Sequence, residues 1–299
     1  MEYINPTGIT MELTELQAFV SVAEAGSFSD AAEQLFITQP AVSKRVAALE
    51  SELDTKLFDR ISRTVSLTEA GRALLPRART ILLEVEDSRR ALSTLTDHIG
   101  GKLSLGTSHH IGLHRLPPVL REYNRNYPQV ELDLHFMDSE QACEAVEHGS
   151  LELGIVTLPL VPPERLTTML IWDDPMSVVV ATDHALCKQQ KISIQTLADY
   201  PAILPAHGTY TRAILERAIQ PFGKPLNIGM STNYLETIKM MVSIGLGWSV
   251  LPNTLIDEDL TPLKVKELKL TRELGLVHHQ DRTRSNAASA LIELLRKAK

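Results

Sequence analysis

Three short segments between residues 13 and 53 place apolar side chains at helical spacing. In the third, TQPAVSKRVAALE at 38–50, the apolar positions form one stripe at i, i+4, i+7 and i+11: Val42, Val46, Leu49 and Leu53. Thr38 or Gln39 can cap this helix, and Pro40 suits its first turn, where the missing N–H costs nothing. Three short helices with a tight link before the third predict a helix-turn-helix.

The other side of the third helix combines small and polar side chains. Its members are Pro40, Ala41, Ser43, Lys44, Ala47 and Ala48, with Arg45 at the margin. Alanines let another backbone approach closely, Ser43 and Lys44 offer hydrogen-bond donors, and the helix N-terminus carries partial positive charge. This face therefore predicts contact with a polyanion.

The next stretch, KLFDRISRTVSLTEAG at 56–71, alternates apolar and polar residues around Val65 and Leu67. The alternation predicts a short hairpin, or wing. Its Arg60 and Arg63 are placed to reach phosphate or a minor groove. A solvated basic loop is the alternative for this stretch.

Residues 69–96 predict one long helix, about 42 Å long at 1.5 Å per residue. Its apolar seam alternates spacings of four and three: Leu74, Ala78, Ile81, Val85, Ser88, Leu92 and Leu95. Pro76 falls inside the helix and should kink it. Because a helix of this length cannot bury its stripe inside a small domain, we expect it to pair with a second copy of the chain.

The rest of the chain alternates strands and helices. Strands are expected at 103–108, 130–137 and 151–158, helices near 113–126 and 139–149, and an extended crossing segment at 168–181. The pattern repeats with PAILP, a helix near 211–220, LNIGMS, a helix near 235–245 and GWSVLP, and a last helix covers 285–298. Two βα units with extended crossovers predict an α/β fold of two Rossmann-like lobes around a cleft.

Composition limits the functions that fit this pattern. The net charge of −7 argues against indiscriminate nucleic-acid binding. Bases are concentrated locally, since residues 55–80 hold six Lys or Arg against two acids, whereas residues 1–37 hold six acids and no Lys or Arg. The N-terminus lacks a signal-peptide pattern and no apolar run reaches about 18 residues, so we expect a cytoplasmic protein without a membrane partner. Residues 1–10 predict a flexible tail.

The run LQAFVSVAEAGSFSDAAEQLFITQPAVSKRVAALESELDTKLFDR, followed by SLTEAGRALLPRA, strongly resembles the N-terminus of LysR-type transcriptional regulators. The second part resembles the effector domain of the same family, which is similar to type 2 periplasmic solute-binding proteins, so the resemblance covers 12–299. It implies that Met11 is the true start. The expected parts are a tail (1–10), a winged helix-turn-helix (11–68), a linker helix (69–98) and an effector domain (99–299) whose lobe I takes about 102–171 and 274–299 and whose lobe II takes about 172–273.

The resemblance also implies sites and partners. Contacts with double-stranded promoter DNA would come from the starts of the second and third helices and from the wing: Ser27, Ser29, Thr38, Gln39, Pro40, Ser43, Lys44, Arg45, Arg60 and Arg63. By chemistry, Gln39 can read adenine, and Lys44 or Arg45 can read guanine or bind phosphate. The family implies a homodimer through the linker helix, a tetramer of two dimers, and RNA polymerase as a further partner.

An effector would bind between the lobes, at strand C-termini and helix N-termini. The expected lining is Thr107, Ser108, His109, His110, Ser139, Thr157, Pro205, His207, Gly208 and Thr209. Donors gathered at helix N-termini favour an anionic ligand, such as a carboxylate. His109 or His110 could serve as a pH-tuned anion ligand; alternatively one faces solvent while the other packs.

Other chemistry finds less support in the sequence. No nucleophile elbow, phosphate-binding loop or dinucleotide glycine motif occurs, so we expect no enzyme and no cofactor. A metal site from His109, His110, His114 and His207 is conceivable, but no acid or cysteine joins them in a known spacing, and no metal is assigned. A redox-responsive or ligand-independent DNA-binding regulator of the same fold is the alternative function, with Cys187 the better redox candidate than Cys143.

Overall fold

The computed structural model describes residues 11–61, 64–93, 98–189, 191–266 and 268–298. The chain divides into two compact units, with the division between Leu92 and Ser93. The predicted tail at 1–10 lies outside the described residues. Within the described part, no helix is both long enough and apolar enough to cross a lipid bilayer.

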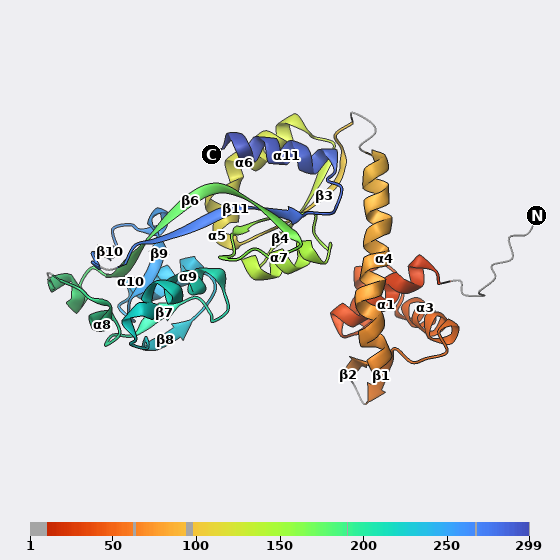
Figure 1. Ribbon diagram of the computed structural model, residues 1–299, viewed down its shortest axis with the longest axis horizontal. Helices are drawn as coiled ribbons and strands as arrows, with labels where there is room; N and C mark the ends of the chain where they lie inside the picture. Colours follow the sequence, from red (N-terminus) through yellow and green to blue (C-terminus); the bar gives the residue numbers. More distant parts are fainter. Residues whose placement is uncertain (1–10, 62–63, 94–97, 190, 267, 299) are drawn as a thin grey trace, which may run out of the picture. The chain divides into compact units, whose positions relative to one another are not determined.

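The first unit is a winged helix-turn-helix followed by a long helix (Figure 1). Its elements are α1 (Leu13–Ala25), α2 (Phe28–Gln34), α3 (Gln39–Glu52), β1 (Phe58–Ile61), β2 (Thr64–Leu67) and α4 (Glu69–Ser93). The predicted stripe of α3 forms the centre of the core, where Val42, Val46 and Leu49 are fully buried. The wing closes this core through Phe58, whose ring centroid lies 5.4 Å from that of Phe19.

The long helix α4 contributes only part of its predicted seam to this unit. Ala78 is fully buried in the core, whereas Ile81 and Leu92 are 37% and 68% exposed. Leu95, the last predicted seam position, lies outside the described residues. Pro76 stands inside the helix, as expected from the sequence. The outer half of α4 therefore carries apolar side chains that the described residues of the first unit leave exposed.

The second unit is an α/β structure of two lobes joined by two long strands. Lobe I contains β3 (Gly101–Thr107), α5 (His109–His114), α6 (Leu116–Asn126), β4 (Val130–Phe136), α7 (Ser139–Glu147), β5 (Leu153–Thr157) and α11 (Asn286–Lys297). Lobe II contains the 3-10 turns η1 (Ala185–Lys188), η2 (Gln220–Phe222) and η3 (Asn253–Leu255), the helices α8 (Ile194–Leu197), α9 (Tyr210–Ile219) and α10 (Leu235–Ser243), and the strands β7 (Ala202–Leu204), β8 (Ile228–Ser231), β9 (Ser249–Pro252) and β10 (Leu260–Leu263). The joining strands are β6 (Leu166–Ala181) and β11 (Leu270–His279).

The strand order explains how the lobes are connected. The main sheet runs β10-β6-β11-β5-β3-β4, with β9 also paired to β6, while β7 and β8 form a parallel pair of their own. Figure 1 shows β6 and β11 passing side by side from one lobe to the other, as their antiparallel pairing requires. Their register shifts between Leu274 and Gly275, opposite Trp172 and Leu170, which is where the predicted lobe boundaries fall.

Helices cover both faces of the lobe I sheet. Along β5, Ile155 packs into the core formed with α6 and α11, and the next residue, Val156, packs on the opposite side with α7. This alternation follows from the two-residue period of a strand. It confirms the expected α/β architecture, with parallel β3, β4 and β5 at its centre.

The structure corrects two expectations about elements. The single helix predicted near 113–126 is two helices, α5 and α6, which meet at Arg115; the prolines that follow Leu116 occupy the first turn of α6. The sequence pattern did not predict β10 or β11, because charged residues interrupt the apolar positions between 260 and 279. The omission of β11 matters because this strand carries Arg272, which lines the cavity described below.

Candidate nucleic-acid interface and effector cleft

The exposed face of α3 is the candidate surface for nucleic acid. Thr38, Gln39, Pro40 and Lys44 are exposed, and Ser43 and Arg45 are partly so. Gln39 Nε2 donates a hydrogen bond to Ser43 Oγ, 2.9 Å away, which holds the glutamine along the helix. Thr38 occupies the N-cap position, but its side chain makes no capping bond. Its hydroxyl is therefore not used in holding the helix end.

The start of α2 differs in this respect. The Ser27 side chain accepts a hydrogen bond from the backbone N–H of Asp30, so this serine caps its helix. Ser29, in the first turn, is exposed. The Ser27 hydroxyl is thus already engaged in capping α2, whereas the Ser29 side chain is exposed.

The wing is tied to the end of α3 by Glu50, a residue that the sequence pattern did not identify. Glu50 is 5% exposed; its Oε1 accepts hydrogen bonds from the backbone N–H groups of Leu57 and Phe58, and its Oε2 pairs with Lys56 Nζ at 2.8 Å. Burial by itself would raise the pKa of Glu50, but these hydrogen bonds and the Lys56 charge lower it below its usual value. The carboxylate therefore stays ionised and orients the wing.

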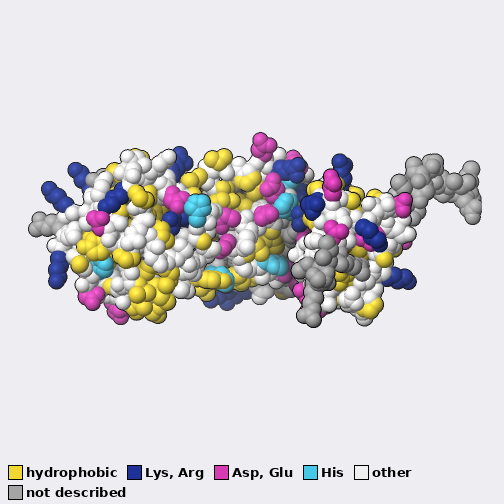
Figure 2. Space-filling model, turned by 90° about the horizontal axis from the view of Figure 1, so that it is seen from below, with side chains coloured by type: hydrophobic (Ala, Val, Ile, Leu, Met, Phe, Trp, Pro, Cys, Tyr) yellow, Lys and Arg dark blue, Asp and Glu magenta, His cyan; other side chains and the backbone are white. Residues whose placement is uncertain are grey.

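The wing itself is the predicted hairpin. β1 and β2 pair antiparallel, with Arg60 opposite Val65. Arg63, predicted at its tip, lies outside the described residues. On the face shown in Figure 2, basic and acidic side chains are interspersed, in keeping with the net charge of −7. The basic residues of α3 and the wing, Lys44, Arg45 and Arg60, are therefore a local feature of an acidic chain.

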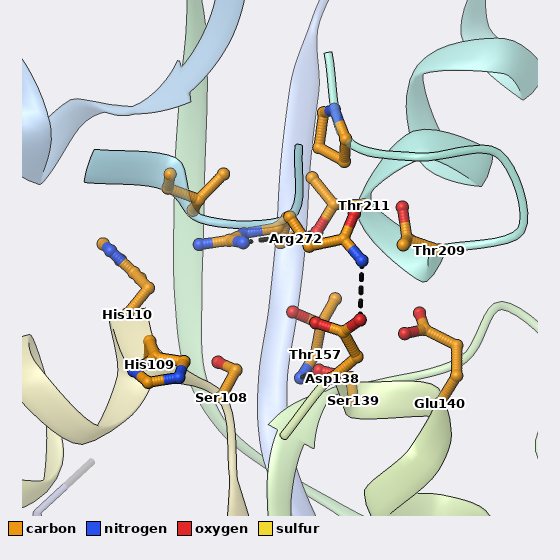
Figure 3. Close-up of a pocket in the computed structure, with 13 residues that line it drawn as sticks. Ser108, His109, His110, Asp138, Ser139, Glu140, Thr157, Thr209, Thr211 and Arg272 are labelled. Atoms are coloured by element: carbon orange, nitrogen blue, oxygen red, sulfur yellow. Dashed lines mark hydrogen bonds between the residues drawn. The ribbon is translucent and has the colours of Figure 1, made fainter. Parts of the chain in front are cut away.

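A cavity between the two lobes is the candidate effector site (Figure 3). Seven of the ten predicted residues line it: Ser108, His109, His110, Ser139, Thr157, Pro205 and Thr209. The sequence pattern missed six further lining residues: Asp138, Glu140, Thr211, Asn233, Leu235 and Arg272. The lining comes from the starts of α5, α7, α9 and α10, the end of β5, and β11.

Three predicted residues do not line the cavity. Thr107 is 1% exposed, and its hydroxyl donates to the carbonyl of Ile155 at 2.8 Å, so it joins two strands. His207 and Gly208 are exposed in the loop before α9, where Gly208 adopts a φ of 92° that favours glycine. The expectation failed because a loop adjacent to a site need not point every residue into it.

The cleft lining carries acids as well as hydroxyls. Asp138 caps α7 and accepts a hydrogen bond at 2.6 Å from Asn233 of lobe II, and Glu140 accepts one from the backbone N–H of Tyr210. Burial raises the pKa of Glu140. Ser139 Oγ accepts from the backbone N–H of Thr157 at 3.0 Å, which fixes the end of β5 against α7. Polar bonds thus run across the cleft between the lobes.

Arg272 on β11 brings a positive charge to the cavity. It is 3% exposed and forms a paired contact with Asp174 Oδ2, from Nε at 2.9 Å and from Nη2 at 2.5 Å. Arg115 Nη2 donates to the other oxygen of Asp174 at 3.0 Å, and Arg272 Nη1 donates to Thr211 Oγ1 at 3.3 Å. Burial lowers the pKa of Arg272, and the Asp174 charge opposes this effect. Two cations therefore share one fully buried carboxylate.

The two adjacent histidines behave differently. His109 is exposed, with its ring centroid 5.4 Å from Phe136 and 4.9 Å from Tyr234. His110 is 3% exposed, and within the described part of the chain neither of its ring nitrogens has a hydrogen-bond partner. Burial, followed by the nearby Arg272 charge, lowers the pKa of His110 to about 4. His110 is therefore neutral at pH 7, which argues against its use as a cationic anion ligand.

The two cysteines, Cys143 and Cys187, are free thiols, and burial makes the first a poor candidate for redox chemistry. Cys143 is buried in lobe I, and its burial raises its pKa to about 11, so almost no reactive thiolate is present at neutral pH. Cys187 is partly buried, and its thiol donates to the carbonyl of Ala181 at 3.5 Å.

Comparison with protein families matches both units. The family model of the bacterial regulatory helix-turn-helix protein, lysR family, matches residues 13–72, and that of the LysR substrate binding domain matches residues 96–299. The chain belongs to the LysR family of transcriptional regulators. This LysR-family chain is therefore a DNA-binding regulator with an effector-binding domain, and the expectation that it is not an enzyme is confirmed.

Relatives and solved structures of LysR regulators align over nearly the whole chain. The uncharacterised HTH-type transcriptional regulator YfeR of Shigella flexneri is 31% identical over 287 residues, which cover 95% of this chain and 93% of YfeR. Full-length OxyR C199D from Pseudomonas aeruginosa has 25% identity and a TM-score of 0.69, with 97% and 94% of the chains covered. CbnR complexed with its target DNA has 19% identity and a TM-score of 0.64, with 96% and 100% covered, a likeness of fold alone.

Proposed function

We propose that this LysR-family protein binds promoter DNA sequence-specifically as a homodimer, under the control of a small effector with an anionic group that binds between its lobes. The observation that carries the proposal is the cavity between lobes I and II, where Arg272 and hydroxyls from both lobes converge. An enzyme would need a reactive group there, whereas a sensor needs only groups that bind. The protein would act in the cytoplasm, where it has access to promoter DNA.

On the DNA side, we assign reading of the major groove to α3. Gln39, held by Ser43, can form two hydrogen bonds to adenine, while Lys44 and Arg45 can contact guanine or phosphate. Thr38 and Pro40 at the start of the helix, with Ser27 and Ser29 of α2, would lie against the backbone. Arg60 and Arg63 of the wing would contact phosphate or a narrow minor groove. The CbnR structure with its target DNA shows that the same fold can bind a duplex.

We assign the homodimer to α4. Ile81 and Leu92 lie on its predicted seam and are exposed within the first unit, so a second copy of α4 would remove them from water. Pairing would also double the number of recognition helices, which raises affinity without a basic overall charge. A tetramer of two such dimers and contact with RNA polymerase extend this assignment.

The effector class follows from the charges in the cleft. Thr209 and Ser139, at the starts of α9 and α7, and Arg272 on β11 favour a carboxylate or similar anion. Asp138 and Glu140 add negative charge on the α7 side of the same cavity. A small carboxylate that also carries a hydrogen-bond donor, such as an amino or hydroxyl group, suits both sides. A ligand-independent regulator would have no use for such a cavity.

DNA binding can be tested by fluorescence anisotropy with promoter DNA and a scrambled duplex over a range of salt concentrations. We expect preference for the promoter and affinity that falls steeply with salt. Replacing Lys44 with Ala should weaken binding to both duplexes and reduce the salt slope by about 1, whereas Gln39→Ala should lose about 1–3 kcal/mol of sequence preference. Lys102→Ala, an exposed lysine of β3, is the matched control. Equal affinity for both duplexes would refute sequence-specific binding.

The effector can be sought in a thermal-shift screen of small carboxylates. A compound that binds the cleft should raise the melting temperature of the wild type, because it binds only the folded state. Thr211→Val removes a cleft hydroxyl at nearly constant volume and should lower the affinity about tenfold. Thr271→Val, at an exposed threonine of β11 that does not line the cavity, is the matched control and should change nothing. If no compound stabilises the protein, or if both variants respond alike, the cleft proposal fails.

A further inference from the structure

One cluster of titratable side chains, which includes His110 of the cavity lining, has no role in the regulator proposed above. His110 and His114 stand four residues apart on α5 of lobe I, which places both on one side of the helix. Glu236, in the first turn of α10 of lobe II, faces them. One ligand atom from each of the three residues lies within 4.8 Å of the others.

We propose that His110, His114 and Glu236 bind a divalent transition-metal ion of the zinc class, which ties lobe I to lobe II beside the effector cleft. Two imidazoles and one carboxylate are a ligand set that zinc accepts in proteins. With bonds of about 2.1 Å, tetrahedral ligand atoms lie about 3.4 Å apart. Glu236 Oε1 lies 3.6 Å from His110 Nδ1 and 3.1 Å from His114 Nε2, close to that separation on both sides.

The state of His110 is an independent observation that points to a ligand. Its side chain is 97% buried, yet neither ring nitrogen has a hydrogen-bond partner among the described residues. A buried polar atom without a partner is costly, on the order of 1–3 kcal/mol, so such atoms are rare without a functional reason. A bond from Nδ1 to a metal ion would satisfy one of them. The neutral imidazole offers its lone pair without first losing a proton.

The surrounding charges permit a cation at this place. Arg272 and Arg115 lie nearby, but both are paired with Asp174, which reduces their repulsion. Glu236 adds a further negative charge at the site itself. A plain ion pair between His114 and Glu236 is the alternative, and it leaves the two nitrogens of His110 unexplained. Three protein ligands also leave a fourth position open, which water or an effector group could fill.

The consequence for the regulator is a link between lobes that depends on metal. His110 and His114 belong to lobe I and Glu236 to lobe II, so a bound ion would resist separation of the lobes. This inference does not depend on the identity of the effector or on DNA binding. The proposed ligand set differs from the four histidines considered from the sequence. Glu236 supplies the missing acidic ligand, whereas His207 is exposed in the loop before α9 and is not part of the cluster.

The first experiment is calorimetric titration of the full chain, purified with a chelator and dialysed, with zinc chloride. We expect one zinc ion per chain, and an affinity at least tenfold lower in His114→Gln and in Glu236→Gln. His135→Gln is the matched control, because His135 is also exposed and paired with an acid, Asp133, at 2.9 Å. Absence of zinc binding, equal binding in all variants, or a loss in His135→Gln of the same size would each overturn the proposal.

His114 and Glu236 are chosen because they are partly exposed, so their replacement leaves the core intact. Without zinc, both variants should melt at the wild-type temperature. Hydrogen exchange then tests the link: zinc should slow exchange in α5 and in α10 together, and the effect should vanish in Glu236→Gln. Protection confined to one of the two helices would show that the ion does not bridge the lobes.

Discussion

Replacing Asp174 with Asn should strongly destabilise the effector unit, because it breaks a buried ion pair and leaves its partner charge behind. Asp174 is fully buried and accepts hydrogen bonds from two arginines, Arg272 and Arg115. Asparagine preserves the shape but not the charge, and its amide group presents donors where an arginine already donates. Arg272, itself 3% exposed, is then left buried without a counter-charge.

The expected loss can be estimated from the burial. Removing one partner of a buried ion pair costs about 3–5 kcal/mol. For a unit of about 200 residues, each kcal/mol shifts the melting temperature by about 2–4 °C, which gives a shift of roughly 6–20 °C. Because the chain has two compact units, differential scanning calorimetry should resolve two transitions, and only that of residues 93–299 should move.

Two further variants make the result decisive. Asp199→Asn breaks an exposed pair with Lys224 and should cost less than about 1 kcal/mol. The double variant Asp174→Asn with Arg272→Met should recover part of the loss, since the uncompensated charge is removed together with its partner. A shift below about 2 °C in Asp174→Asn, or one no larger than that of Asp199→Asn, would refute the reasoning.

Three other predictions use single residues. Ellman's reagent at pH 8 should label Cys187 well before Cys143, because burial raises the pKa of Cys143 to about 11; equal rates would contradict this. In the presence of EDTA, the free energy of unfolding should fall by roughly 3 kcal/mol at most as the pH drops from 6.5 to 4. Between these pH values His110 is protonated in the unfolded chain but stays neutral in the folded protein, where its pKa is about 4, so acid favours unfolding. A His110→Gln variant should therefore show a smaller fall in denaturant titrations. Glu50→Ala should destabilise the DNA-binding unit by about 2 kcal/mol in thermal melts, because two backbone N–H groups lose their acceptor; an unchanged first transition would show that the wing does not need this carboxylate.

The sequence by itself determined the DNA-binding unit almost completely. The stripe of Val42, Val46 and Leu49 predicted the buried side of α3, and the alternation around Val65 predicted the wing. Both features belong to single short elements, so the spacing of apolar residues within each element is enough to predict them. The role of Glu50 could not be predicted from the sequence, because its hydrogen bonds depend on how the chain turns after α3 and follow no regular spacing.

Tertiary structure decided the chemistry of the cleft. Sequence spacing placed Ser139 and Thr157 at element ends, where they line the cavity, but Arg272 lies in a strand that the pattern did not predict. The Arg272 side chain can be buried because Asp174, 98 positions away in the sequence, compensates its charge. Likewise, His114 meets Glu236 across 122 positions. Charges are buried only where a partner compensates them, and partners from different lobes meet only after the strands have paired.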